Sequence, residues 1–113
     1  MTNFLEETRG ILTTHDKTPD DVLWVGAADY GYMTWREFAD VANVRYDHGY
    51  GAQEIAKDLV IVGNIWWLER YEYDGSESWE YKELPVKPVK HLRVKSVKGG
   101  MWATLEKINE GEL

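Results

Sequence analysis

The sequence predicts a single α+β domain over residues 1–113, in which a largely antiparallel sheet with a Trp/Tyr-rich hairpin packs against two to three helices. Three observations predict this class. The chain has 113 residues, of which 43% are hydrophobic and 29% charged, the size and balance of one globular domain. Its apolar patterns follow the order helix, strand, helix, strand, hairpin, strand, helix. Its clearest turn signal, Asp74-Gly75, lies between two aromatic-rich stretches of strand length.

The first helix is predicted from about Asn3 to Thr14. Apolar side chains recur there at helical spacing, Thr2 is a candidate N-cap, and two glutamates occupy the first turn, where the helix dipole favours negative charge. Turn chemistry follows in residues 16–21, and the apolar run 22–25 has the composition of a short buried strand.

A second helix is predicted to begin after Thr34. The sequence Thr34-Trp35-Arg36-Glu37 matches the capping box, in which the threonine hydroxyl and the glutamate carboxylate each accept a hydrogen bond from the other residue's backbone N–H. Apolar residues continue at helical spacing from Trp35 to Tyr46, so Gly49 is the expected end of the helix.

The remaining elements follow in order. Residues 52–57 could form one or two helical turns, and the apolar run 59–62 is expected to be a strand. The hairpin spans residues 65–84, and the length of its loop decides which side chains share a face. With two or four loop residues, one face carries Trp66, Leu68, Arg70, Trp79 and Tyr81, and the other carries Trp67, Tyr71, Tyr73 and Leu84. A strand over residues 92–95 and a closing helix over residues 101–108 complete the prediction.

The chain is acidic overall, but its charge is uneven. It carries 13 Lys+Arg and 20 Asp+Glu, a net charge of −7. Residues 1–84 contribute 17 acidic and 7 basic side chains (net −10), and residues 85–113 contribute 3 and 6 (net +3). Residues 85–98 contain five cations and no acid: Lys87, Lys90, Arg93, Lys95 and Lys98. Such a strip either neutralises acidic neighbours in the same domain or contacts nucleic acid, although the net charge of the chain disfavours nucleic-acid binding.

Several classes of function are disfavoured by what the sequence lacks. Without cysteine, thiolate catalysis and Cys-ligated zinc are excluded, and a reducing, cytoplasmic location is expected. The chain has no signal-like start and no apolar run near 18 residues, so we expect no membrane association. It also lacks the Gly-x-Ser-x-Gly, His-Glu-x-x-His and phosphate-loop patterns. We therefore expect no metal, no cofactor and a non-catalytic protein.

One alternative is a small ligand-binding or nucleotide-binding protein, or a hydrolase, that uses Asp47 and His48. These residues lie at the predicted end of the second helix, where the dipole favours a charged histidine. Tyr50, between two glycines, is the third candidate, because glycines let the backbone approach a ligand closely. The simpler interpretation is that Asp-His-Gly only terminates the helix.

Aromatic content predicts a binding surface. The chain has six Trp and seven Tyr but only two Phe, and the rings of Trp and Tyr suit half-buried positions and protein interfaces. If one face of the hairpin packs on helices, the other presents the candidate partner-binding residues Trp67, Glu69, Tyr71, Tyr73 and Glu80. Arg70, on the helix-packed face, is expected to stack on Trp79 or Tyr81.

The central part of the sequence resembles a family of small uncharacterised acidic proteins encoded by prophages and other mobile elements of Gram-positive bacteria. The resemblance extends from Leu23 to about Pro88. It rests on residues 46–51, 54–56, 58–63, 66–70 and 72–77. The family often has an aromatic residue where this chain has Ser78, which removes one ring from the face of Trp67.

The resemblance carries no catalytic residue to this chain. Its genomic setting implies that a small acidic protein of this kind engages a host or phage protein and inhibits host defence, for example as an anti-CRISPR-like protein or a mimic of DNA charge. This agrees with the charge pattern, because a negative field steers a protein toward basic clefts. Oligomeric state is left open.

Overall fold

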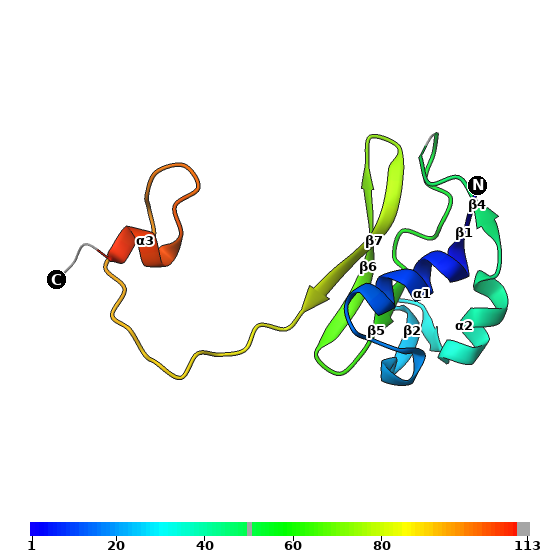
Figure 1. The fold of residues 1–113 in the computed structure, drawn as a ribbon, viewed down its shortest axis with the longest axis horizontal. Coiled ribbons are helices and arrows are strands. Elements are labelled where there is room, and N and C mark those ends of the chain that lie inside the picture. The colour runs from blue at the N-terminus through cyan, green and yellow to red at the C-terminus, as the bar shows by residue number, and fades with distance from the viewer. Residues whose placement is uncertain (50, 111–113) are drawn as a thin grey trace.

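The computed structural model describes residues 1–49 and 51–110, and its centre is a five-stranded antiparallel sheet with strand order β3-β2-β5-β6-β7. Helices α1 and α2 lie against one side of this sheet (Figure 1). The sheet strands are β2 (Trp24–Ala27), β3 (Gly31–Met33), β5 (Val60–Val62), β6 (Trp66–Tyr73) and β7 (Ser76–Glu83). The other elements are β1 (Thr2–Asn3), α1 (Phe4–Thr14), η1 (Pro19–Asp21), α2 (Trp35–Ala42), β4 (Arg45–Tyr46) and α3 (Leu105–Asn109). This confirms the predicted α+β class with a largely antiparallel sheet.

The first helix forms as predicted, but its cap differs. The side chain of Asn3, rather than Thr2, accepts the hydrogen bond from the backbone N–H of Glu6, at 2.9 Å. Thr2 instead pairs with Tyr46 in the short β1–β4 ladder, which sequence patterns did not indicate. A two-residue strand leaves no periodicity to detect.

The second helix begins at its predicted capping box and ends early. The Glu37 carboxylate accepts from Thr34 N at 2.9 Å, and the Thr34 hydroxyl accepts from Glu37 N at 3.2 Å. These hydrogen bonds from Thr34, the backbone one first, lower the pKa of Glu37 below its usual value. The helix ends at Ala42 instead of Gly49, because the chain turns at Asn43 to pair with β1. Tyr46 is buried as predicted, but it points into the core from strand β4.

Two smaller expectations in the first sixty residues are corrected. The strand expected over residues 22–25 lies at Trp24–Ala27, and its partner β3 was not predicted. Residues 52–57 contain no helix, and the Glu77 carboxylate accepts from the backbone N–H groups of Glu54 and Ile55, at 2.6 and 3.3 Å.

The hairpin turn at Asp74-Gly75 has two residues, one of the two loop lengths that give the predicted faces. Asp74 and Gly75 have positive φ angles of 52° and 84°, the conformation that suits a tight turn between twisted strands. Arg70 lies opposite Trp79, and Leu68 lies opposite Tyr81. The predicted division of the hairpin into two faces is therefore confirmed. The face carrying Trp66, Leu68, Arg70 and Trp79 packs beneath the helices, and we call it the inner face.

A buried ion pair lies at the centre of the inner face. Arg70 Nη2 donates to Glu77 Oε1 at 2.8 Å, and the two side chains are 0% and 1% exposed. The guanidinium also lies 4.8 to 5.8 Å from the ring centres of Trp79, Phe4 and Tyr46. The expected stacking of Arg70 on Trp79 is thus confirmed, and it is one side of an aromatic box around the cation.

The same cluster ties the helix and the strands to the hairpin. The Tyr46 hydroxyl donates to the Glu7 carboxylate at 2.5 Å, and Trp79 Nε1 donates to the Thr8 hydroxyl at 2.8 Å. Each bond joins residues at least 39 positions apart in the chain. These two hydrogen bonds therefore join α1 to β4 and to the hairpin, in addition to the apolar packing of Phe4 and Leu12.

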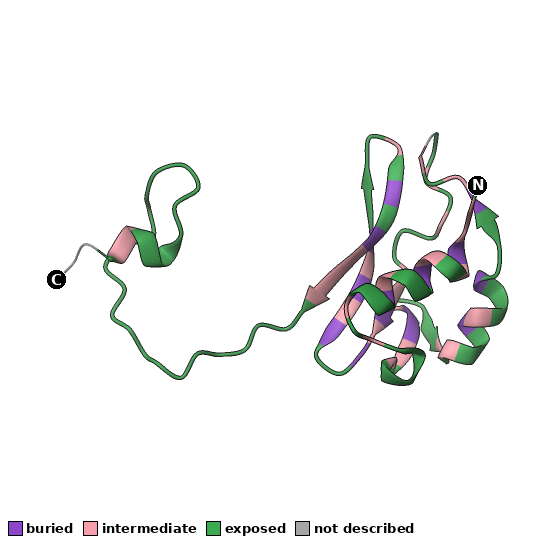
Figure 2. Cartoon of the chain, in the orientation of Figure 1, coloured by how far each residue is buried: buried purple, intermediate pink, exposed green. Residues whose placement is uncertain are grey.

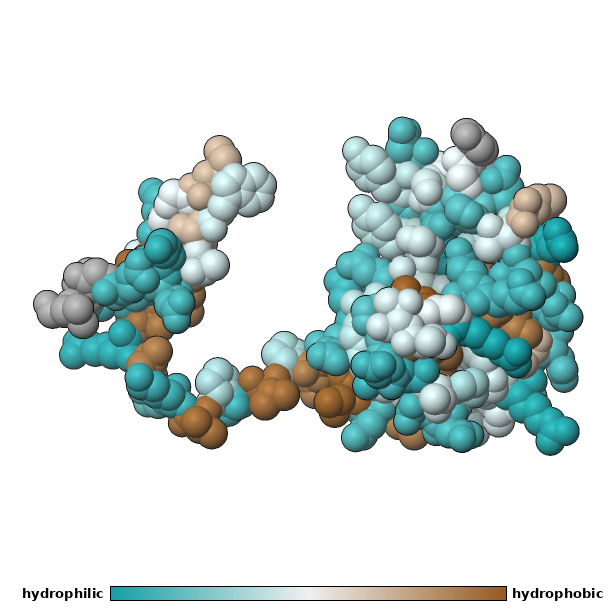
Figure 3. Space-filling view, viewed as in Figure 1, coloured by the Kyte–Doolittle hydropathy of each residue, from teal (hydrophilic) through white to brown (hydrophobic). Residues whose placement is uncertain are grey.

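The last part of the chain departs from the prediction. Residues 85–104 contain no helix or strand, so the strand expected over residues 92–95 is absent, and the closing helix is reduced to α3 (Leu105–Asn109). The extended segment carries α3 away from the sheet (Figure 1), and hydrophobic and hydrophilic side chains follow one another along it (Figure 3). Pro85 and Pro88 have no backbone N–H for a sheet ladder, which opposes continued strand pairing.

The protruding segment makes the molecule elongated. Its extents are 58 × 32 × 28 Å, and its radius of gyration is 18.7 Å, whereas a compact domain of this length has about 13 Å. Among the residues that the structure describes, the buried ones lie in the sheet, in α1 and α2 and in their connections (Figure 2). No helix among residues 1–49 and 51–110 is both long and apolar enough to cross a membrane.

The capping box of α2 should make a measurable contribution to the stability of the fold. Thr34→Ala removes the acceptor for Glu37 N and should lower the free energy of unfolding by about 0.5–2 kcal/mol, measured by urea denaturation. Thr34→Ser keeps the hydroxyl and serves as the control. Equal losses in the two variants would contradict the capping role.

Substitutions in the buried Arg70–Glu77 pair should lower the free energy of unfolding in a non-additive way. Arg70→Met or Glu77→Gln alone leaves one buried charge without its partner and should cost about 3–5 kcal/mol of unfolding free energy. The double variant removes both charges, and the single amide oxygen of the glutamine can still accept from Glu54 N, the shorter of the two loop bonds. Urea denaturation should therefore show a smaller loss in the double variant than the sum of the single losses, and additive losses would argue against the pair.

Tyr46 predicts a loss of stability at alkaline pH. Burial, together with the hydrogen bond to Glu7, raises the pKa of Tyr46 from 10.0 to about 12. The folded state thus keeps this proton at a pH where the unfolded state has lost it, so the stabilisation is complete below pH 10 and is lost as the pH rises toward 12. Tyr46→Phe should show a shallower fall of unfolding free energy over this range in urea titrations, and parallel curves would contradict the assignment.

Candidate partner-binding face

The partner-binding residues predicted from the sequence all lie on the side of the sheet away from α1 and α2. We call this side the outer sheet face. Trp67, Glu69, Tyr71 and Tyr73 project there from β6, and Glu80 joins them from β7 directly opposite Glu69. Tyr71 is 48% exposed and Tyr73 71% exposed, while the other three side chains are half-buried. The structure thus brings the five predicted residues together on one accessible surface.

The outer sheet face extends further than the hairpin. The register places Val62 beside Trp67 and Trp24 beside Val62, and Tyr32 lies opposite Gly26 on the next strand. Among the residues that the structure describes, the half-buried apolar side chains packed on the core do not include Trp24, Val62 or Trp67. A row of rings and aliphatic groups therefore crosses the sheet from β3 to β6 outside the core.

Sequence reasoning missed Trp24 and Tyr32 as members of this face. Both belong to aromatic-containing strand segments, which was the available signal. Their place on the surface depends on β2 pairing with β5, and a residue pattern within one strand does not reveal its neighbour.

Two carboxylates face each other in the middle of the hairpin's outer side. Glu69 and Glu80 occupy directly opposed positions on β6 and β7, where like charges are unfavourable. Trp67 Nε1 donates to Glu69 Oε1 at 2.8 Å, and Lys82 Nζ lies 3.1 Å from Glu80 Oε1. The hydrogen bond to Glu80, followed by the charges of Glu80 and Glu69, raises the pKa of Lys82. One cation thus balances two carboxylates, and the group keeps a net charge of −1.

The alternative ligand-binding residues do not form an organised site in the part of the chain that is described. His48 is exposed at the surface of the loop after β4 instead of at a helix end, and its ring centre lies 6.0 Å from that of Tyr46. Asp47 Oδ1 accepts from Gly49 N at 3.0 Å, a local turn bond. The His48 carbonyl, and not its imidazole, meets the hairpin by accepting from Glu77 N at 2.8 Å. Tyr50 lies outside the described residues.

No metal site is indicated in residues 1–49 and 51–110, where no group of three or more His, Cys, Asp or Glu side chains is arranged to hold an ion. The strip of cations at residues 85–98 is exposed along the extended segment rather than forming a strand of the sheet. Both interpretations of this strip, neutralisation of acidic neighbours and contact with nucleic acid, stay predictions.

Comparisons of the chain with protein families, curated proteins and solved structures found no match.

The opposed carboxylates predict a coupled effect on stability. Lys82→Met should lower the melting temperature, because it leaves Glu69 and Glu80 facing each other without a nearby cation. Adding Glu69→Gln should restore it, since the amide oxygen still accepts from Trp67 Nε1 and one negative charge is gone. A melting temperature that is equally low with and without Glu69→Gln would show that Lys82 acts by some other contact.

Proposed function

We propose that this chain is a non-catalytic acidic binding protein whose outer sheet face docks a protein partner. The observation that carries the proposal is the accessible arrangement of Trp67, Tyr71 and Tyr73 around the opposed carboxylates of Glu69 and Glu80. Rings of Trp and Tyr bury large areas at little entropic cost and are enriched among residues that dominate protein interfaces.

The charges define the chemistry of the partner. An arginine or lysine of the partner, placed between Glu69 and Glu80, would relieve their repulsion and form charge-assisted hydrogen bonds. Trp67 and Tyr71 flank that position on the same face and offer rings to pack against the cation and its aliphatic stem. Over residues 1–84 the net charge of −10 would speed the approach of a basic surface.

The biological setting that we propose is a phage or mobile element, with a host defence protein as the target. The resemblance of residues 23–88 to acidic prophage-encoded proteins supports this setting. A nuclease of a defence system presents a basic nucleic-acid cleft, and an acidic face with aromatic side chains complements such a cleft in charge and in apolar contact. Action in the cytoplasm follows from this target.

The test compares two variants that change charge equally. Glu69→Lys with Glu80→Lys alters the outer sheet face, whereas Glu6→Lys with Asp40→Lys makes the same change at exposed positions of α1 and α2. Proteins captured from a Gram-positive host by the wild-type chain are identified, purified and titrated against all three proteins. We expect the partner's Kd to rise by about tenfold or more for the face variant only.

Three results would contradict the proposal. The partner could bind the face variant as tightly as the wild type. The helix-side variant could lose as much affinity as the face variant, which would indicate a general charge effect. Binding could also persist unchanged in Trp67→Ala with Tyr71→Ala, which would show that the rings take no part.

A further inference from the structure

The C-terminal residues 95–110 form a small ordered unit, which we call the knob. The side-chain amide of Asn109 makes four hydrogen bonds within the knob. Its Oδ1 accepts from Lys95 N at 3.0 Å and from Ser96 N at 3.2 Å. Its Nδ2 donates to the carbonyl oxygen of Ser96 at 3.0 Å and to that of Leu105 at 2.8 Å. Thr104 caps α3 by accepting from Lys107 N at 3.2 Å. These bonds hold the loop of residues 97–103 against the helix.

The loop of the knob presents two apolar side chains to solvent. Met101 is 82% exposed and Trp102 is 90% exposed. Trp102 also has a φ angle of 66°, a left-handed conformation that is unfavourable for a residue with a side chain. Gly99 cannot be larger, because a Cβ there would lie 2.6 Å from Ile108 Cγ1. The indole of Trp102 is thus held in a defined conformation of the knob and is not covered by the rest of the knob.

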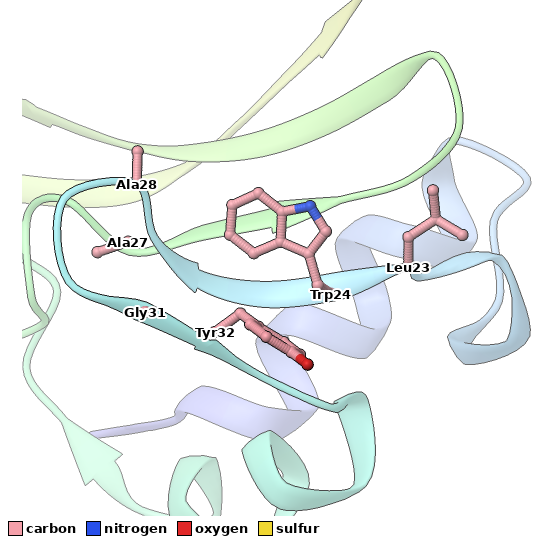
Figure 4. Close-up of a pocket in the computed structure, with 6 residues that line it drawn as sticks. All are labelled: Leu23, Trp24, Ala27, Ala28, Gly31 and Tyr32. Carbon is pink, nitrogen blue, oxygen red and sulfur yellow. The ribbon is translucent and has the colours of Figure 1, made fainter.

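A pocket that suits an indole lies at the β3 edge of the sheet, whereas the chain leaves the sheet for the knob from the other edge strand, β7. Its volume is about 550 Å³, and its walls are Leu23, Trp24, Ala27, Ala28, Gly31 and Tyr32 (Figure 4). Apart from the indole nitrogen of Trp24 and the phenol hydroxyl of Tyr32, the lining side chains are apolar. Gly26 keeps β3 close to β2 beside the pocket, because a Cβ there would meet the Gly31 carbonyl oxygen at 2.1 Å. Tyr32 is 76% exposed, so the pocket is open to a partner.

The charges of the two parts are opposite. The pocket is bordered by acidic residues: Asp20 and Asp21 precede Leu23, Asp29 follows Ala28, and Asp58 lines the adjoining hollow beside Tyr32. The segment that leads to the knob carries Lys87, Lys90 and Arg93 and no acid, and Lys98 lies in the loop of the knob. Electrostatic attraction therefore favours approach of the knob to the pocket.

We propose that the knob of one chain docks in the Trp24–Tyr32 pocket of a second copy, so that two chains exchange their C-terminal arms. The sheet order favours exchange over docking within one chain, because β7 and β3 are at opposite edges of the sheet and the arm leaves from β7. Pro85 and Pro88 stiffen the start of the arm, which points away from its own sheet (Figure 1). Reciprocal exchange gives a closed two-fold dimer with two identical contacts. The pocket lies at the β3–β2 end of the outer sheet face, whereas the opposed carboxylates of Glu69 and Glu80 lie on β6 and β7, so the dimer and the proposed docking of a partner are tested with different residues.

Sedimentation velocity of the full chain over a series of concentrations tests the proposal. We expect a monomer–dimer equilibrium that weakens as salt is added. Trp102→Ala and Tyr32→Ala should each weaken dimerisation by about tenfold or more, because each removes one ring of the contact. Tyr30→Ala is the matched control: it removes a neighbouring tyrosine that is 94% exposed, and it should leave the dimer unchanged. All three positions are exposed, so circular dichroism should show intact folding.

Mixing the two weakened variants separates exchange from docking within a chain. The Trp102→Ala chain keeps its pocket and the Tyr32→Ala chain keeps its indole, so an equimolar mixture regains one intact contact and should dimerise more strongly than either variant alone. A mixture no stronger than the separate variants would overturn the exchange. So would a wild type that stays monomeric at every concentration, or a dimer that neither substitution weakens.

Discussion

The pairing of Arg70 with Glu77 inside the core is the interaction on which the rest of the structure depends. A guanidinium and a carboxylate that are both removed from water require each other, because either one alone would be a buried, unpaired charge. Glu77 also accepts from the backbone of residues 54 and 55, and its own N–H donates to His48, so one side chain and one backbone group fasten the long loop before β5 to the hairpin. Three aromatic rings complete the surroundings of Arg70, and two of them come from α1 and β4.

This cluster also fixes which side of the hairpin faces outward. Because side chains alternate along a strand, placing Arg70 and Trp79 inside obliges Trp67, Glu69, Tyr71 and Glu80 to lie outside. A slip of one residue would bury Glu69 and expose Arg70, which would break the pair of Arg70 with Glu77. The buried Arg70–Glu77 pair therefore favours one strand register in the hairpin. That register decides which side chains make up the outer sheet face. The opposed pair of Glu69 and Glu80 is a feature that packing alone does not favour, as expected where a surface serves binding.

Local signals in the sequence predicted the local structure well. Thr34 and Glu37 cap a helix whatever follows them, and Asp74-Gly75 sets the hairpin turn and with it the two faces. The five candidate residues of the hairpin followed directly from that turn. The errors arose where distant parts of the chain meet: the second helix ends early because residues 45 and 46 pair with the N-terminus, and His48 is thereby removed from any helix end. Trp24 and Tyr32 were missed for the same reason, since their place depends on strand order. The valine-rich run of residues 86–97 has strand composition, but it pairs with no strand of the described sheet.

Docking on the outer sheet face requires that this face is open in the free protein while the inner face is sealed. Hydroxyl-radical footprinting of the dilute full chain, read residue by residue by mass spectrometry, tests it most directly. The account predicts strong labelling of Tyr71 and Tyr73, intermediate labelling of Trp67, and protection of Tyr46 and Trp79. Protection of Tyr71 and Trp67 as complete as that of Trp79 would show that something covers the outer face and would contradict the account.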